Sequence, residues 1–232
     1  MNNREKVKNI IAPSFVFVMT ALWIIILFVS SNRFISYAGV VACFAFSLLF
    51  INRTNLVLVQ VLAFAFTVIA DFFLILLEGE HKTIAMLSFL IAQGFYALKT
   101  MLYAKSKREK HVQLILRFSI SIVGGAMVFI VLKSQAQALF VISVVYYVNL
   151  ILSVIFSYMH FKGGKNQKLT AIGLSLFSLC DITIGFDFLI DIFSLGASSL
   201  VYKIVSLPIN LVHFFYYPSQ TLLAVSVLTK NK

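Results

Sequence analysis

The sequence predicts an all-α, polytopic membrane protein with eight transmembrane helices in one bundle. Of its 232 residues, 61% are hydrophobic and only 12% are charged, whereas soluble domains have about 45–50% and about 25% respectively. Apolar segments recur along the whole chain, and each spanning helix needs about 20 residues. Eight spans leave about 70 residues for loops and tails, so we expect a single transmembrane domain over residues 1–232. This composition excludes a soluble enzyme, a disordered tail and a disulfide scaffold.

The apolar segments give the positions of the predicted helices. They cover residues 14–30, 34–51, 56–77, 83–104, 112–132, 136–160, 169–190 and 204–228. Each is expected to be helical, because a backbone in lipid must satisfy its hydrogen bonds within its own segment. No small-residue cleavage site follows the first segment, so we expect it to be a retained helix. The eighth contains Pro208 and Pro218, which predict a kinked or broken helix.

The basic residues predict how the bundle is oriented. Alternate loops, starting from the N-terminus, hold fifteen lysines and arginines, with Lys99 and Arg117 counted among them. The opposite loops hold only four: Arg33, Lys82, Lys133 and Lys203. Because cytoplasmic loops carry the positive excess, both termini are predicted to be cytoplasmic. The net charge of +11 therefore indicates contact with a bilayer and no nucleic-acid partner, and we expect a multi-pass protein of a bacterial cytoplasmic membrane.

Two aspartates lie inside the predicted spans. Asp71 is seven residues before Glu78, and Asp181 is ten residues before Asp191, which places them about 10 Å and about 15 Å below the outer boundary. An ionised aspartate at the centre of a spanning helix costs about 2.5–3.5 kcal/mol. Such residues need partners, protonation or a function, and intramembrane carboxyl groups often mark functional sites. The structural alternative is a protonated pair that links neighbouring helices.

Polar side chains on two returning helices are the candidate partners of these aspartates. They form one stripe on the fourth segment and one on the eighth at helical spacing: Gln93, Tyr96 and Thr100, then His213, Tyr216, Tyr217 and Gln220. We expect Asp71, Asp181, Gln93, Tyr96 and His213 to reach one cavity in the outer half of the membrane or near its midplane. The alternatives are that the amides link helices and that the tyrosines only pack. No metal site is predicted, because no second histidine stands at ligand spacing from His213.

Four short motifs occur in order along the chain. They are Ala70-Asp71 before Phe72-Phe73-Leu74, Phe89-Leu90 before Gln93-Gly94-Phe95-Tyr96, Cys180-Asp181 before Asp187, and Tyr216-Tyr217-Pro218-Ser219-Gln220. In this order and spacing, the region from about residue 56 to residue 228 resembles the lysoplasmalogenase (YhhN-like) family of membrane proteins. Two positions depart from the family pattern: Ala70 stands where the family has glycine, and Gln93 stands where it has histidine.

The resemblance implies hydrolysis of the vinyl-ether bond of lysoplasmalogens, which releases a fatty aldehyde and a glycerophospho-base without a cofactor. This reaction needs an acid, stabilisation of an oxocarbenium ion and a base for water. We expect Asp71 and Asp181 to be that pair, by analogy with glycoside cleavage. The expected substrate-binding residues are Gln93, Tyr96, His213, Tyr217 and Gln220.

Two other interpretations stay open at this stage. Glutamine cannot exchange protons as histidine does near neutral pH, so Gln93 favours a non-catalytic relative that binds a lipid or a partner helix. Alternatively, the two carboxyl groups form the relay of a small proton-coupled transporter. The prolines of the eighth segment are a partial sign of the discontinuous helices that such transporters use.

Overall fold

The computed structural model describes residues 3–29, 32–50, 54–77, 81–133, 138–194 and 196–228, with side chains from residue 10 onward except at 132 and 191–193. Helices are the regular structure found in these ranges, which confirms the predicted all-α class. They are α1 (Asn3–Phe28), α2 (Arg33–Leu48), α3 (Asn55–Asp71), α4 (Lys82–Tyr103), α5 (Lys107–Leu132), α6 (Ala138–Met159), α7 (Lys165–Phe193), α8 (Leu200–Val205) and α9 (Leu211–Val225). A π-helical turn over Phe72–Leu76 continues α3, and short 3₁₀ turns cover Phe161–Gly163 and Ser226–Leu228.

Seven helical segments of the described chain are long and apolar enough to cross a membrane. They include α1, α3 with its π turn, α4, α5, α6, α7 and α9 with its 3₁₀ turn. Helix α2, with 16 residues, is about 24 Å long, which is shorter than about 30 Å of hydrocarbon. The chain is therefore a multi-pass membrane protein, whereas the count of eight and the side on which the termini lie remain predictions.

The predicted interruption of the last segment occurs at Pro208 and not at Pro218. Helix α8 ends at Val205, and the residues around Pro208 form the connection to α9. Asn210 then caps α9, because its side chain accepts a hydrogen bond of 3.1 Å from the backbone N–H of His213. This cap places His213 in the first turn of α9, while Pro218 lies within the helix.

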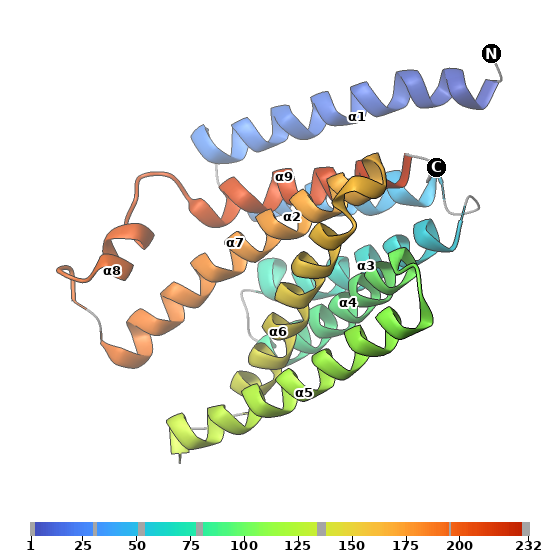
Figure 1. The fold of residues 1–232 in the computed structure, drawn as a ribbon. Coiled ribbons are helices and arrows are strands. Elements are labelled where there is room, and N and C mark those ends of the chain that lie inside the picture. Colours follow the sequence, from blue (N-terminus) through green and yellow to red (C-terminus); the bar gives the residue numbers. More distant parts are fainter. Residues whose placement is uncertain are drawn as a thin grey trace.

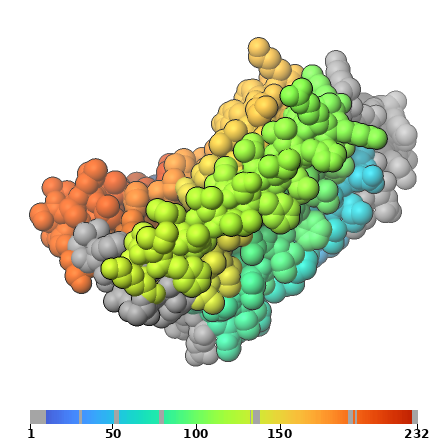
Figure 2. Space-filling view, turned by 60° about the horizontal axis from the view of Figure 1, so that its bottom comes forward, coloured from blue at the N-terminus to red at the C-terminus, as the bar shows by residue number. Residues whose placement is uncertain are grey.

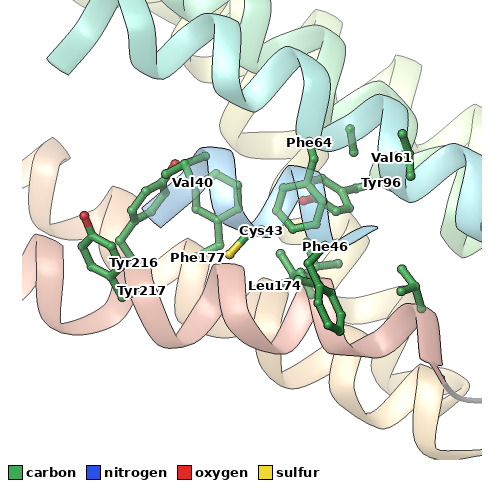
Figure 3. Packing of buried hydrophobic residues seen from close by; sticks show 14 of the residues in the cluster. Val40, Cys43, Phe46, Val61, Phe64, Tyr96, Leu174, Phe177, Tyr216 and Tyr217 are labelled. Carbon is green, nitrogen blue, oxygen red and sulfur yellow. The ribbon is translucent and has the colours of Figure 1, made fainter. Parts of the chain in front are cut away.

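Helix pairs build the bundle around a core to which α2, α3, α7 and α9 contribute most (Figure 1). α7 packs against α9, α3 against α4, and α6 joins α4 to α5. Figure 3 shows side chains of this core, among them Cys43, Phe64 and Phe177. α1 lies at one edge, against α9 and α2.

Helix α5 lies at the other edge of the bundle and extends across the face seen in Figure 2. Its exposed side chains include Ile115, Phe118, Ile122 and Val123. So many exposed aliphatic and aromatic groups on one helix suit contact with lipid and not with water. The composition and this face together indicate that the bundle is embedded in a membrane.

Two basic residues do not lie where the charge count placed them. Lys99 and Arg117 were counted with the loops, but they lie inside α4 and α5, where they are only 1% and 5% exposed. Without them, the predicted cytoplasmic loops still hold thirteen basic residues against four. Hydropathy counting fails here because it registers the charge but not the neutral hydrogen-bond acceptors that surround it. Glu78, from which the depth of Asp71 was counted, lies outside the described residues, as does the side chain of Asp191.

Candidate active site: an apolar cavity with two aspartates

A cavity of about 630 Å³ lies among α2, α3 with its π turn, α4, α6, α7 and α9. Most of its wall is aliphatic or aromatic. The polar side chains in the wall are Ser36, Asp71, Lys82, Ser143, Tyr146, Tyr147, Asp181, His213, Tyr216 and Tyr217. Its size lies within the range of about 300–1,000 Å³ that is typical of small-molecule sites. An apolar enclosure with a few convergent polar groups is the usual form of such a site.

Both predicted aspartates line this cavity, although 110 positions separate them in the chain. Asp71 is the last residue of α3 and is 2% exposed, and the π turn begins immediately after it. Single π turns occur often at functional sites. Asp181 lies in α7 and lines the same cavity.

Each aspartate accepts a hydrogen bond from a tyrosine of a different helix. The Tyr216 hydroxyl of α9 donates to Asp71, and the Tyr146 hydroxyl of α6 donates to Asp181. Two equivalent Asp–Tyr pairs therefore face one enclosure. A hydroxyl donor fixes the direction of the carboxyl group and satisfies one of its oxygens, while the other oxygen keeps its lone pairs for a further contact.

A chain of aromatic rings holds the two tyrosines in place. The ring centroids of Tyr146 and Phe89 are 6.0 Å apart, those of Phe89 and Phe177 6.2 Å, and those of Phe177 and Tyr216 5.7 Å. These distances are typical of favourable edge-to-face and tilted aromatic contacts. Both Asp–Tyr pairs are thus attached to the same rigid set of rings. The sequence interpretation missed Tyr146; the available signal was a polar ring in the middle of an apolar span.

His213, which was expected to reach the cavity, lines it, and so does Tyr217 of the same stripe. Their ring centroids are 6.0 Å apart. Within the described part of the chain, the His213 Nδ1 atom is buried without a hydrogen-bond partner, and the Tyr217 and Ser36 hydroxyls approach each other without a standard hydrogen bond. A buried polar group left unpaired costs about 1–3 kcal/mol. This part of the wall is therefore suited to a polar group of a bound molecule.

Gln93, Tyr96 and Gln220 are fully buried but do not line the cavity. Gln93 approaches the hydroxyl of Tyr146 without a standard hydrogen bond, so it lies behind the Tyr146–Asp181 pair. The Tyr96 hydroxyl instead accepts a hydrogen bond of 3.3 Å from Gln60 Nε2. Depth counting gives the height of a residue in the membrane but not the direction in which its side chain points, which explains why only part of the expected set converges.

A second group of polar residues surrounds Lys99 and Arg117. The Lys99 ammonium donates to Gln60 Oε1 at 2.7 Å and to Ser226 Oγ at 2.9 Å. The Arg117 guanidinium donates to the Asn149 carbonyl at 2.9 Å and to Thr100 Oγ1 at 3.1 Å. No described carboxylate pairs with either cation, and neither lines the cavity. We call Lys99, Arg117 and these four partners the cation cluster.

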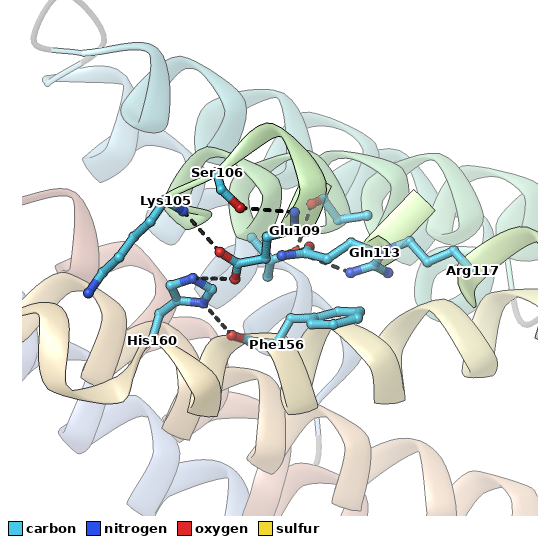
Figure 4. Close-up of polar contacts among 9 residues, drawn as sticks. Lys105, Ser106, Glu109, Gln113, Arg117, Phe156 and His160 are labelled. Atoms are coloured by element: carbon cyan, nitrogen blue, oxygen red, sulfur yellow. Dashed lines mark hydrogen bonds and ion pairs between the residues drawn. The ribbon is translucent and has the colours of Figure 1, made fainter. Parts of the chain in front are cut away.

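The start of α5 is tied to the end of α6 beside the cation cluster (Figure 4). Glu109 accepts a hydrogen bond of 3.0 Å from the Lys105 backbone, and its other oxygen lies 2.8 Å from His160 Nε2. Ser106 caps α5 by accepting from the Glu109 backbone N–H at 3.1 Å. The opposite nitrogen of His160 lies 2.8 Å from the Phe156 carbonyl oxygen. These contacts join two helices and lie away from the cavity.

The residues of the cavity suit acid–base chemistry that the side chains perform themselves. In the described ranges, no group of three or more histidine, cysteine, aspartate or glutamate side chains gathers that could hold a metal ion.

Residues 16–227 match the family model described as the YhhN family. Comparisons with curated proteins and with solved structures gave no match.

Proposed function

The chain belongs to the YhhN family, and we propose that it is a membrane-embedded lysoplasmalogenase. The proposed reaction cleaves the vinyl-ether bond of a lysoplasmalogen with water and yields a fatty aldehyde and a glycerophospho-base. The observation that carries the proposal is the pair of carboxyl groups, Asp71 and Asp181, which line one apolar cavity and are each oriented by a tyrosine.

The two carboxyl groups divide the chemistry between them. One acts as an acid and donates a proton to the alkenyl carbon that is not bonded to oxygen, so an oxocarbenium ion forms at the neighbouring carbon. The other acts as a base and removes a proton from water as the water oxygen attacks that carbon. The resulting hemiacetal then breaks its bond to the glycerol oxygen, which takes up a proton, and the aldehyde is released. Two carboxyl groups in one cavity can serve opposite roles where their environments differ.

The surroundings of the pair suit this sequence of steps. A carboxylate near the oxocarbenium ion stabilises its positive charge, and an apolar wall strengthens that interaction by excluding water. The hydrocarbon chain of the substrate takes its place beside aliphatic wall residues such as Leu74, Met86 and Val148. His213, Tyr217 and Ser36 have unpaired polar atoms that can hold the attacking water or the glycerol oxygens.

Gln93 bears on the choice between an enzyme and a non-catalytic relative. It replaces the histidine of the family pattern, yet it does not line the cavity in this chain. Gln93 can influence the proposed reaction through the Tyr146 hydroxyl, which it approaches. The replacement therefore leaves all the cavity-facing groups of the proposed mechanism in place, which supports the catalytic alternative.

The decisive experiment uses the purified full-length chain in lipid nanodiscs with a lysoplasmalogen, and measures fatty aldehyde. Asp71→Asn and Asp181→Asn should each lower the rate by about 10²–10⁴-fold, the range expected for losing a general acid or base. Asp187→Asn is the matched control, because Asp187 lies in α7 and does not line the cavity. The melting temperature of each variant reports whether it is folded.

The outcomes separate the three interpretations. Full activity in both Asp71→Asn and Asp181→Asn would reject the aspartate mechanism. Substrate-dependent proton flux in liposomes without aldehyde would identify a transporter. Lipid binding with neither aldehyde nor flux would identify a non-catalytic relative.

A further inference from the structure

The rim of the cavity carries one permanent positive charge. Among the described residues that line the cavity, Lys82 is the one lysine or arginine. It is the first residue of α4, it is exposed, and its ammonium lies 5.8 Å from the centre of the Phe188 ring of α7. Within the described ranges, no carboxylate forms an ion pair with it. Lys82 therefore offers its charge at the mouth of the cavity.

The position of Lys82 differs from that of the aspartates. Phe188, over which Lys82 lies, is 40% exposed, whereas Asp71 is 2% exposed. The cavity thus runs from a basic rim to an acidic interior with apolar walls. An anionic group of a ligand is repelled by ionised carboxylates in the interior and attracted by the ammonium at the rim. This charge distribution gives a ligand with one anionic group a defined direction in the cavity.

The backbone beside Lys82 adds to this preference. The residue before it, His81, makes no side-chain capping hydrogen bond to α4. The first turn of a helix has free N–H groups and a partial positive charge, which together favour anions. Lys82 and the uncapped start of the 22-residue helix α4 therefore act in the same direction at the same place.

We propose that Lys82, with the first turn of α4, binds the phosphate of a single-chain phospholipid whose ether linkage reaches Asp71 and Asp181. This inference rests on the proposed function, and it names the feature of the substrate that the site selects. The protein then discriminates a lysophospholipid from the neutral alkenylglycerol that has the same chain and the same vinyl-ether bond but no phosphate. Lys82 is a specificity residue and takes no part in proton transfer.

The test compares two substrates and four proteins in nanodiscs made of zwitterionic lipid. The substrates are an alkenyl-glycerophosphoethanolamine and the corresponding alkenylglycerol; the proteins are the unmodified chain, Lys82→Gln, Lys82→Arg and Lys203→Gln. Lys203 is the matched control, because it is an exposed lysine of α8 on the same predicted side and does not line the cavity. Lys82→Gln should raise KM for the phospholipid about tenfold, as expected for loss of a charge-assisted contact, with kcat nearly unchanged. Lys82→Arg should restore KM.

The same substitution should leave KM for the alkenylglycerol unchanged, and Lys203→Gln should behave as the unmodified chain with both substrates. An equal effect of Lys82→Gln on both substrates, or no effect on either, would overturn the proposal. So would an effect of Lys203→Gln as large as that of Lys82→Gln.

A binding measurement distinguishes failure of this inference from failure of the proposed reaction. The probes are an alkyl-glycerophosphoethanolamine and an alkylglycerol, which carry no vinyl-ether bond, and the readout is the shift in melting temperature on binding. Suppose that the unmodified chain releases no aldehyde but prefers the phosphate probe, and that Lys82→Gln lacks this preference. The proposed reaction then fails and the phosphate site stands. If aldehyde forms and the preference is the same in Lys82→Gln, the reaction stands and the phosphate site fails.

Discussion

The aspartate cavity and the cation cluster both place charged groups inside a membrane bundle, but they treat those charges differently. In the cation cluster, Lys99 donates to Gln60 and Ser226, Arg117 donates to Asn149 and Thr100 while its Nε has no partner among the described residues, and neither cation lines the cavity. In the cavity, Asp71 and Asp181 each have one tyrosine donor and face open space next to unpaired polar atoms.

This difference separates a structural use of buried charge from a functional one. Buried charges are tolerated when hydrogen bonds satisfy them, and a satisfied network fixes the packing of the helices around it. Charges that keep free lone pairs beside a cavity have not used their capacity within the protein, and a ligand can use it. We therefore expect substitutions in the cavity to affect turnover and substitutions in the cation cluster to affect stability.

The largest expected effect is the loss of activity in Asp71→Asn. Removing the proton-transfer group should lower aldehyde release by about 10²–10⁴-fold, while the amide keeps the size of the side chain and its bond to Tyr216. Turnover and thermal unfolding measured on the same preparation check both parts of this expectation. A melting temperature that falls along with activity would show that Asp71, like Lys99, mainly stabilises the fold.

Lys99→Ala should show the opposite pattern. It leaves Gln60 Oε1 without its charged donor, and a buried acceptor left unpaired costs about 1–3 kcal/mol. Turnover by the folded fraction should stay within about twofold of the unmodified chain, since a difference of about 0.4 kcal/mol or less is expected at a remote site. Unfolding by denaturant, followed by circular dichroism, measures this loss of folding stability. A tenfold loss of turnover at unchanged stability would join the two regions into one functional unit.

A smaller effect is expected for Tyr216→Phe. The ring contact with Phe177 remains, but Asp71 loses its hydroxyl donor, and a net hydrogen bond is worth about 0.5–1.5 kcal/mol. The rate should fall by about two- to tenfold, through the orientation of Asp71. Tyr158→Phe is the control for ring substitution, because Tyr158 lies in α6, is exposed and does not line the cavity. A loss as large as that of Asp71→Asn would give Tyr216 a direct part in proton transfer.

Much of this arrangement can be predicted from the sequence, because the length and composition of each segment can be read directly along the chain. The helical segments, an interrupted last segment and the candidate aspartates all follow from apolar runs, proline chemistry and the cost of intramembrane charge, whereas only the structure shows that the interruption is at Pro208. Which side chains share a cavity depends on how each helix is rotated about its axis. Rotation separates Tyr96, which contacts Gln60, from Tyr146, which contacts Asp181. Both tyrosines lie in apolar spans, and the sequence analysis included Tyr96 among the expected cavity residues and left out Tyr146.

The smallest expected effect concerns Gln93→His, which restores the family pattern. Position 93 lies behind Tyr146 and outside the cavity wall, so a histidine there acts on Asp181 only through the Tyr146 hydroxyl. An influence transmitted through one intermediate group should not exceed about 0.5 kcal/mol, or a rate change of about two- to threefold. The measurement is aldehyde release by Gln93→His beside Gln93→Asn, which keeps the amide. If Gln93→His raises the rate tenfold or more and Gln93→Asn does not, a titrating group at this position takes part in proton transfer. The functional site then includes position 93, which lies behind the residues that line the cavity.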